Sequence, residues 1–231
     1  MRLALEGAER FTAVVSDTQS AGRGRNGHTW TSPSGVGLYA SLVLRPAVTV
    51  ERVPVVTLVA GIAAAEAIAQ LTGLHARLKW PNDVLINRHK VAGILCEGSF
   101  SKRGEDAIVI AGLGVNVNTQ PQDVPERPLF PASSLLAESG RHHDRDVLLD
   151  LWIERARHWV DVLECGNIAL IIERWKDLDA LSGERLRVSL PDGRVVEGVE
   201  CGTDEAGCLV LRLDDGTRFS VIAGDVKIAV G

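Results

Sequence analysis

Two arginines in a glycine-rich segment are the residues of this sequence best suited to bind an anion. The segment GRGRNG spans residues 22–27 and places Arg23 and Arg25 two positions apart. Glycines let backbone N–H groups approach an anion closely, and in an extended segment both arginines would point to one side. The pair could then grip one phosphate or carboxylate, because a guanidinium matches the geometry of both. The alternative is a flexible surface loop whose arginines are only solvated.

A second candidate segment is KWPND, residues 79–83. Pro81 favours an extended or turn geometry, which leaves Asn82 and Asp83 at the end of a strand. The amide of Asn82 could pair with a base edge, as such groups do with adenine. The carboxylate of Asp83 could hold a magnesium ion that is also bound to phosphate. An ordinary turn stabilised by the Asn and Asp side chains would explain the same residues.

Two apolar segments carry further candidate residues. HKVAGILCE, residues 89–97, places Lys90 at the start of a strand, where it could neutralise an acyl phosphate or be a solvated edge residue. GLGVNVN, residues 112–118, ends a buried strand with small residues, which suits close approach of a flat ligand or a simple bulge. Trp30 could stack on a purine or fill the core.

The elements that must position these motifs are strands around one long apolar helix. We expect strands at residues 11–17, 37–46, 76–80, 90–100 and 107–118, and helices at 55–72, 145–166 and 167–178. The first of these strands is expected to be buried, because it is short, β-branched and bounded by polar residues. The proline-rich segment 119–131 is expected to form an irregular loop.

From residue 183 the pattern changes to short strands separated by the turns PDG, DEAG and DDG. Asp-Gly turns between alternating apolar segments indicate hairpins, so we expect a small closed β-barrel or sandwich here. The sequence therefore predicts two domains, residues 1–182 and residues 183–231.

Composition limits the classes of protein that are compatible with the chain. A net charge of −5 over 231 residues and a pI of about 5.7 argue against a general nucleic-acid binder. The four cysteines include no pair with the spacing of a zinc or redox motif, which favours reduced thiols in the cytoplasm. Glu66 lies inside the Ala-rich segment 55–72, so this segment is expected to be a core helix and not a membrane span.

Taken together and in this order, GRGRNGHTW, KWPNDV, HKVAGILCE and GLGVNVN resemble the motifs of biotin protein ligase, also called biotin–[acetyl-CoA carboxylase] ligase. The resemblance covers nearly the whole chain. It implies an α+β fold, with a class II aminoacyl-tRNA synthetase-like catalytic domain of mixed β-sheet and helices and a small C-terminal SH3-like β-barrel. Only 21 residues precede Gly22, so the resemblance implies the monofunctional form without a DNA-binding domain.

Two departures from the family pattern accompany the resemblance. The family loop usually has an arginine where this chain has His28, and a mostly neutral histidine weakens the local positive field. The Ser-Thr-Asn segment that lines the family's biotin pocket is not found upstream of Gly22.

The activity implied by the resemblance is ATP-dependent biotin ligation. Biotin and ATP form biotinyl-5′-AMP, and biotin then passes to a lysine of a biotin carboxyl carrier protein domain of acetyl-CoA carboxylase or a related carboxylase. The implied cofactors are ATP, biotin and Mg²⁺, and a homodimer is a candidate oligomeric state. No nucleic-acid or membrane partner is expected.

The family's functional positions transfer to this chain residue by residue. By resemblance, the catalytic residues are Arg23, Arg25 and Lys90. The residues matched to biotin are Gln19, Arg23, Gly24, Arg25, Lys90 and Gly93. Those matched to ATP are Trp30, Lys79, Asn82, Gly112, Gly114 and Asn116, with Asp83 as the metal ligand. The loop at 119–131 corresponds to one that orders over the adenylate.

Three other functions remain open on the sequence. A lipoate or octanoyl ligase would have a similar fold, although the pair GRGR and KWPND favours biotin. A non-catalytic biotin-binding or regulatory protein would follow from loss of the N-terminal segment. A scaffold that docks partners through its C-terminal β module would bind carrier domains without forming an adenylate.

Overall fold

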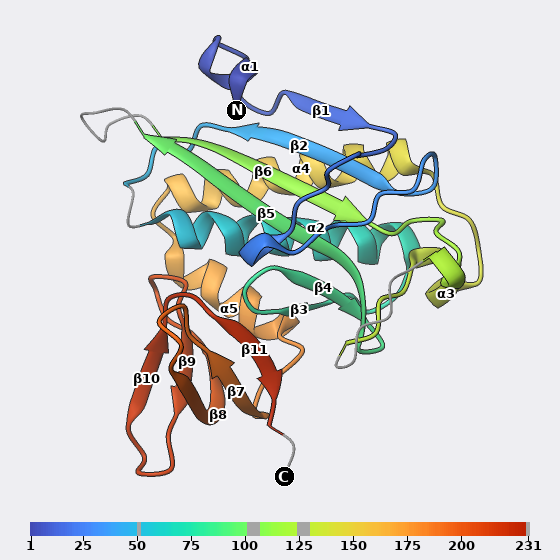
Figure 1. Cartoon of the computed structure of the whole chain (residues 1–231). Helices are drawn as coiled ribbons and strands as arrows, with labels where there is room; N and C mark the ends of the chain where they lie inside the picture. The colour runs from blue at the N-terminus through green and yellow to red at the C-terminus, as the bar shows by residue number, and fades with distance from the viewer. Residues whose placement is uncertain (50–51, 101–106, 124–129, 230–231) are drawn as a thin grey trace.

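Two antiparallel sheets form the framework of the chain, as a computed structural model shows (Figure 1). The structure describes residues 1–49, 52–100, 107–123 and 130–229. The larger sheet has six strands in the order β1-β2-β6-β5-β4-β3. Their bounds are β1 Ala13–Ser16, β2 Leu38–Leu44, β3 Arg77–Lys79, β4 Asp83–Ile86, β5 His89–Phe100 and β6 Ala107–Val115.

All ladders of the six-stranded sheet are antiparallel. A mixed sheet, with parallel and antiparallel strands, was expected. Among the described residues, parallel pairing at this sheet occurs in two isolated bridges, Leu78 with Asp179 and Lys90 with Ala132. Neighbouring strands β5 and β6 form the longest ladder, from Ala92 opposite Val115 to Phe100 opposite Ala107.

Strand β1 differs from the expectation for residues 11–17. The segment does form a strand, but it is an edge strand and not a buried one, because among the described residues only β2 pairs with it. Val14 and Val15 are 45% and 49% exposed. A short β-branched segment is typical of central strands and of edge strands alike, so its composition does not predict whether the strand is buried.

Three helices cover one face of the six-stranded sheet (Figure 1). They are α2 Val53–Thr72, α4 Arg145–Glu164 and α5 Ile168–Leu178. Helix α2 lies between the sheet and the other two helices, which explains why it is apolar on all sides. By length and composition α2 could cross a membrane, but 72% of its apolar window is buried inside the fold, and the expected core helix is confirmed.

The C-terminal sheet has five strands in the order β10-β9-β8-β7-β11. Their bounds are β7 Arg185–Ser189, β8 Val195–Thr203, β9 Leu209–Arg212, β10 Arg218–Val221 and β11 Asp225–Ile228. The arrangement is consistent with an SH3-like fold. Closure into a barrel, as expected from the sequence, is not found, since β10 and β11 pair only with β9 and β7 among the described residues. The chain crosses from one edge to the other after β10, which leaves these two strands on opposite edges.

The two sheets share one hydrophobic core. Leu186, Leu209 and Leu211 of the C-terminal sheet belong to the same buried cluster as the residues of α2 and the larger sheet. Polar contacts join them as well: Trp80 Nε1 donates to the carbonyl of Gly207 at 3.1 Å. The C-terminal sheet is therefore held against the β3–β4 turn, next to the pocket described below.

Short elements complete the fold. Helices α1 Arg2–Leu5 and α3 Leu135–Ser139 and the 3₁₀ turns η1 Arg25–Gly27 and η3 Pro121–Asp123 had no counterpart among the expected elements. Each has five residues or fewer, too short to show a helical period in the sequence. All four cysteines lie in the described residues and are free.

Candidate functional site

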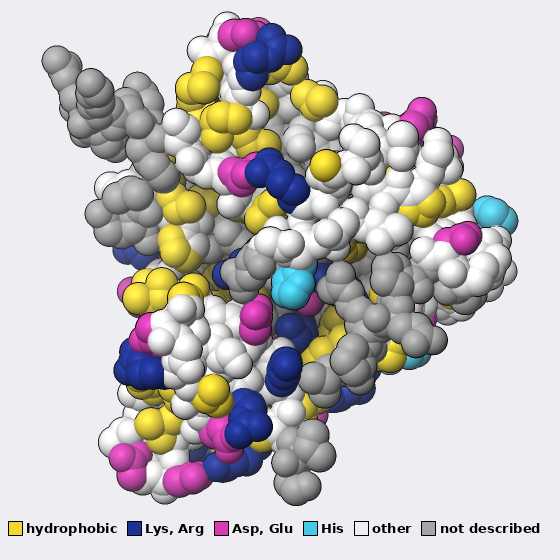
Figure 2. All heavy atoms as spheres, in the orientation of Figure 1, with side chains coloured by type: hydrophobic (Ala, Val, Ile, Leu, Met, Phe, Trp, Pro, Cys, Tyr) yellow, Lys and Arg dark blue, Asp and Glu magenta, His cyan; other side chains and the backbone are white. Residues whose placement is uncertain are grey.

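A cavity of about 560 Å³ opens on the face of the six-stranded sheet that the three long helices leave uncovered. Its walls come from the loop between β1 and β2, the turn between β3 and β4, strands β5 and β6, and the start of β11. Figure 2 shows basic and acidic side chains gathered around the hollow in the middle of this face, between the larger body and the C-terminal sheet. The cavity therefore has charged walls and lies at a junction of the two sheets.

Glycines on adjacent strands form the floor of this cavity. Gly93 of β5 lies directly opposite Gly114 of β6. The indole of Trp30 rests on them so closely that a Cβ on Gly114 would lie 2.6 Å from the ring, and one on Gly93 would lie 3.1 Å from it. Glycine at position 114 is thus required for the ring to reach the sheet, and a side chain at position 93 would push the ring by a few tenths of an ångström.

The indole of Trp30 also meets a cation at this floor. Lys90 Nζ lies 5.5 Å from the centre of the Trp30 ring, within the range of a cation–π contact. The indole N–H is buried and has no hydrogen-bond partner among the described residues. A buried donor without a partner is costly, and this one lies against Gly114 of β6.

The glycine-arginine segment folds into a tight hairpin over the cavity. The Gly24 N–H donates to the carbonyl of His28 at 2.7 Å, and the Trp30 N–H donates to the carbonyl of Gly22 at 2.9 Å. A Cβ on Gly22 would lie 2.3 Å from the carbonyl oxygen of Trp30. The glycine at position 22 is therefore needed to close the hairpin, independently of any bound anion.

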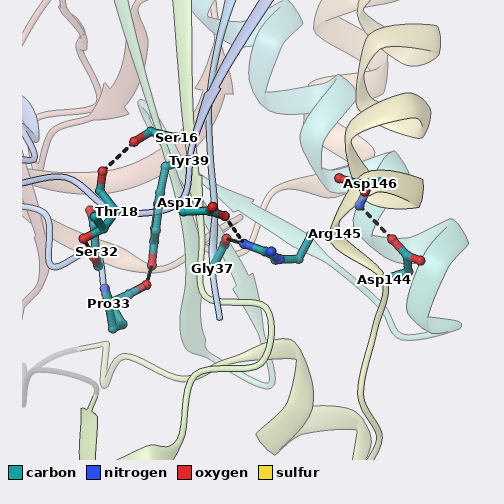
Figure 3. A network of polar contacts seen from close by, with 10 residues as sticks. All are labelled: Ser16, Asp17, Thr18, Ser32, Pro33, Gly37, Tyr39, Asp144, Arg145 and Asp146. Carbon is teal, nitrogen blue, oxygen red and sulfur yellow. Dashed lines mark hydrogen bonds and ion pairs between the residues drawn. The ribbon is translucent and has the colours of Figure 1, made fainter. Parts of the chain in front are cut away.

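Arg145, the first residue of α4, joins the two ends of the loop between β1 and β2, which contains this hairpin (Figure 3). Its Nη1 donates to Asp17 Oδ1 and to the carbonyl of Gly37, both at 3.2 Å. Near the second end, the Tyr39 hydroxyl donates to the carbonyl of Pro33 at 3.1 Å. Burial raises the pKa of Tyr39 to about 12, so the hydroxyl stays protonated and remains a donor. The loop is fixed at its base while its tip carries the arginines.

The two arginines of the loop do not point to one partner, although an extended segment was expected to place them side by side. Arg23 Nη2 pairs with Glu97 Oε2 of β5 at 3.1 Å. The backbone enters a 3₁₀ turn at Arg25, which breaks the extended alternation. Burial lowers the pKa of Arg25, and the nearby carboxylates of Asp225 and Asp83 partly oppose that effect. Both arginines line the cavity, but Arg23 is paired with Glu97, whereas Asp225 and Asp83 are the carboxylates near Arg25.

One carboxylate lies between two lysines on the floor of the cavity. Asp83 Oδ1 accepts a close contact from Lys90 Nζ, and Lys79 Nζ lies 3.6 Å from Asp83 Oδ2. All three side chains are largely buried, with 11%, 11% and 15% of their surface exposed for Lys79, Lys90 and Asp83. Two buried cations against one anion leave a net positive charge, which favours an anionic ligand.

The surroundings of Asp83 do not fit a resident magnesium ion. Mg²⁺ prefers several oxygen ligands, and a cation at Asp83 would face two ammonium groups at close range. No group of three or more His, Cys, Asp or Glu side chains that could hold a metal occurs in residues 1–49, 52–100, 107–123 and 130–229. We therefore derive no step through a metal held by Asp83, whose predicted magnesium role stays a prediction.

The structure brings nearly all of the predicted site residues into one cavity. Those that line it are Gln19, Arg23, Gly24, Arg25, Trp30, Lys79, Asn82, Asp83, Lys90, Gly93, Gly112 and Gly114. Asn116 is not among the lining residues, since its amide donates to the carbonyl of Ser133 at 2.9 Å and holds that segment beside β5. The amide of Asn82 donates to the carbonyl of Ile94 at 2.7 Å, which leaves its oxygen for a ligand.

Three charged lining residues escaped the sequence analysis. Glu97 ends the segment HKVAGILCE and lies on the same face of β5 as Gly93, so strand alternation could have indicated it. Asp225 and Lys227 come from the C-terminal sheet, and nothing in the local sequence indicates that they reach the cavity. The expected ordering of loop 119–131 over a ligand involves residues 124–129, which lie outside the described residues.

Comparisons with known proteins agree over the length of the chain. The model of the biotin/lipoate A/B protein ligase family matches residues 2–116, and that of the biotin protein ligase C terminal domain matches residues 181–228. The bifunctional ligase/repressor BirA of Bacillus subtilis is 33% identical over 229 residues, which cover 98% of this chain and 69% of that protein. The biotin–[acetyl-CoA-carboxylase] ligase of Paracoccus denitrificans is 36% identical over 202 residues, covering 86% and 83%.

A solved structure shares the same architecture. Biotin protein ligase from Aquifex aeolicus in complex with biotin and ATP superposes with a TM-score of 0.83 at 29% sequence identity. The match covers 100% of this chain and 94% of that one, so both sheets and the helical layer have counterparts there.

Proposed function

The chain belongs to the biotin/lipoate A/B protein ligase family, and from this membership we propose that it is an ATP-dependent biotin–protein ligase. The proposed reaction joins biotin and ATP as biotinyl-5′-AMP and then transfers biotin to a lysine of a carrier domain. The relatives named biotin–[acetyl-CoA-carboxylase] ligase and the Aquifex structure with biotin and ATP support this reading.

The observation that carries the proposal is the convergence of cations on one cavity with a glycine floor. Lys79 and Lys90 lie on the floor, and Arg23 and Arg25 reach it from the loop. The reaction needs such charges, because a biotin carboxylate must approach the α-phosphorus of ATP although both are anions. The carboxylate is already ionised at neutral pH, so the first step needs no general base.

In the first step a carboxylate oxygen of biotin bonds to the α-phosphorus, and pyrophosphate leaves with the electron pair of the broken P–O bond. We assign Lys90 and Arg25 to neutralise the charge of the α-phosphate. Arg23 would also hold the ligand, and to do so it must first leave its ion pair with Glu97. Trp30, which rests on Gly114, and Gly112 on the same strand as Gly114 would provide the flat surface for the ligand rings.

In the second step the neutral amine of the carrier lysine attacks the acyl carbon, and AMP leaves with the bond electrons. The hairpin formed by residues 22–30 lies over the cavity, and we propose that it shields the mixed anhydride from water in the interval between the steps. Sealing of this kind protects a reactive intermediate without taking part in the chemistry.

Further parts of the function are proposals of the same kind. The substrate protein is a biotin carboxyl carrier domain of a carboxylase, the enzyme acts in the cytoplasm, and a homodimer is its proposed assembly. Mg²⁺ would enter with the triphosphate and not as a resident ion. We propose that residues 1–182 form the catalytic unit and residues 183–231 an accessory unit that completes the pocket.

A biotin-dependent exchange of label between pyrophosphate and ATP tests the proposed function. We expect exchange with the 231-residue chain when biotin is present, and none when biotin is replaced by lipoate or octanoate. Exchange that depends on lipoate or octanoate would identify a lipoate-type ligase instead. Biotin binding without exchange would identify a non-catalytic biotin-binding protein.

A further inference from the structure

Strand β11 presents two charged side chains to the cavity from the C-terminal sheet. Asp225, Val226 and Lys227 all line the cavity, but Val226 is 6% exposed and belongs to the shared core, whereas the charged residues on either side of it are exposed. This is the alternation expected of a strand with one buried face. The C-terminal sheet thus contributes one acidic and one basic group to the lining of the cavity.

Asp225 and Arg25 of the glycine-arginine loop line the same cavity. The charge of Asp225 stabilises the protonated form of Arg25 against the effect of burial. An anion that reaches Arg25 therefore competes with a carboxylate that is already close to it. The two residues are 200 positions apart in sequence, so only the docking of the two sheets brings them together.

Lys227 differs from three other cations that line the cavity, Lys79, Lys90 and Arg23. Lys79 and Lys90 share Asp83, and Arg23 pairs with Glu97. Arg187, the residue directly opposite Lys227 on β7, is paired with Glu197 at 2.8 Å. Lys227 has no ion pair within 4.0 Å among the residues that the structure describes. It is an exposed cation that the C-terminal sheet adds to the lining of the cavity.

We propose that Lys227 binds the β- and γ-phosphates of ATP, and that Asp225 holds Arg25 until the α-phosphate takes its place. The proposal rests on the proposed function and adds residues of the C-terminal sheet to it. When the carboxylate oxygen of biotin bonds to the α-phosphorus, the bridging P–O bond breaks and the electron pair leaves on pyrophosphate. Lys227 stays paired with that leaving group, while Arg25 stays with the adenylate.

The two half-reactions separate this role from a structural one. We compare Lys227→Gln with Lys227→Arg, and with Arg218→Gln on β10, the opposite edge of the same sheet. We expect Lys227→Gln to raise the KM for ATP in pyrophosphate exchange by about 5- to 10-fold, as loss of a charge-assisted contact to a partly solvated phosphate implies. Transfer of biotin from purified biotinyl-5′-AMP should change less than about twofold, because no pyrophosphate remains in that step. Lys227→Arg and Arg218→Gln should resemble the wild type.

Asp225→Asn provides a change of opposite sign on the same strand. It removes the carboxylate that competes for Arg25, so the affinity for ATP, measured by titration calorimetry, should increase by about two- to fivefold. Equal loss of both half-reactions in Lys227→Gln, an unchanged KM for ATP, or weaker ATP binding in Asp225→Asn would each overturn the proposal. A wild-type chain that binds ATP but shows no exchange would contradict the proposed function. The ATP affinities of the wild type, Lys227→Gln and Asp225→Asn, measured by calorimetry, would still test the proposed roles of Lys227 and Asp225.

Discussion

Gly114 lies beneath Trp30 with no room for a side chain between the strand and the indole. A methyl group on the glycine would occupy space that the ring already fills, at 2.6 Å from its nearest atom. The relationship makes the glycine floor and the tryptophan a single packed unit, so a change in one must move the other. The consequence can be measured at the ligand.

Gly114→Ala should lift the indole from the floor and disturb the pocket. We expect a loss of about 1–3 kcal/mol of stability from overpacking, with a weaker affinity for biotin in titration calorimetry. Trp30→Phe in the same chain should restore much of the stability, because the smaller ring leaves room for the new methyl group. Stability losses that simply add in the double variant would show that the two residues are not coupled.

Lys90→Ala should impair adenylate formation while the fold is kept. The residue is one of two buried cations at Asp83, and loss of one charge aimed at a developing anion costs about 10²- to 10³-fold in rate. Pyrophosphate exchange measures the effect, and circular dichroism verifies the fold. The matched control is Lys176→Ala, an exposed lysine of α5, which should exchange like the wild type. A normal rate in Lys90→Ala would contradict the assignment.

Arg145→Ala should loosen the loop that carries Arg23 and Arg25. Both ends of the loop lose a donor at once, so ordering of the loop on binding becomes more costly and the KM for both substrates should rise by about fivefold. Asp17→Asn is the comparison, since Asp17 is 75% exposed and the bond to Gly37 remains. Hydrogen exchange of residues 18–36 should be faster in Arg145→Ala alone. Equal protection in both variants would remove Arg145 as the anchor.

The stability of the chain should depend on pH through Asp179, which precedes the C-terminal sheet. Burial and then the carboxylate of Glu200 raise the pKa of Asp179 to about 7, and the hydrogen bond from the Leu181 N–H and the charge of Arg77 oppose them only in part. Because the native state holds this proton more tightly than the unfolded state, this group's contribution to stability decreases as the pH rises from about 4 to 7. It is fully present at lower pH.

Asp179→Asn should remove that dependence. Thermal unfolding between pH 5 and pH 8 should show a smaller decrease in Tm for this variant than for the wild type. Asp192→Asn is the control, because Asp192 lies on a surface turn and its pKa is lowered by hydrogen bonds from Arg194. Parallel Tm curves for the wild type and Asp179→Asn would show that Asp179 does not hold a proton in this range.

Much of the framework could be predicted from local patterns. The helix expected at 145–166 is observed at Arg145–Glu164, and the strands expected at 90–100 and 107–118 are observed at His89–Phe100 and Ala107–Val115. These segments have a clear period or a strongly apolar composition, and their boundaries coincide with caps such as Asp144. The edge position of β1 was not predictable, because exposure depends on which strands pair beside it.

The pocket was predictable where chemistry and motif coincide, as at Lys90, Asp83 and Gly114. The divergence of Arg23 and Arg25 depends on a 3₁₀ turn of three residues, which has no sequence period of its own. The reach of Asp225 and Lys227 into the cavity depends on how one sheet docks against the other. Tertiary contacts of this kind join residues far apart in the chain, so local sequence patterns do not predict them.

The shared hydrophobic core has a practical consequence for anyone who divides the chain. Cutting the chain after residue 182 would expose buried apolar side chains on both pieces. It would also leave the indole N–H of Trp80 without its acceptor, the carbonyl of Gly207. The two sheets should therefore melt in one calorimetric transition, and neither piece should be a usable catalytic or docking module when expressed alone. Exchange of the C-terminal sheet between homologues would succeed only if the residues on both sides of its contact with the larger sheet and helix α2 were exchanged together.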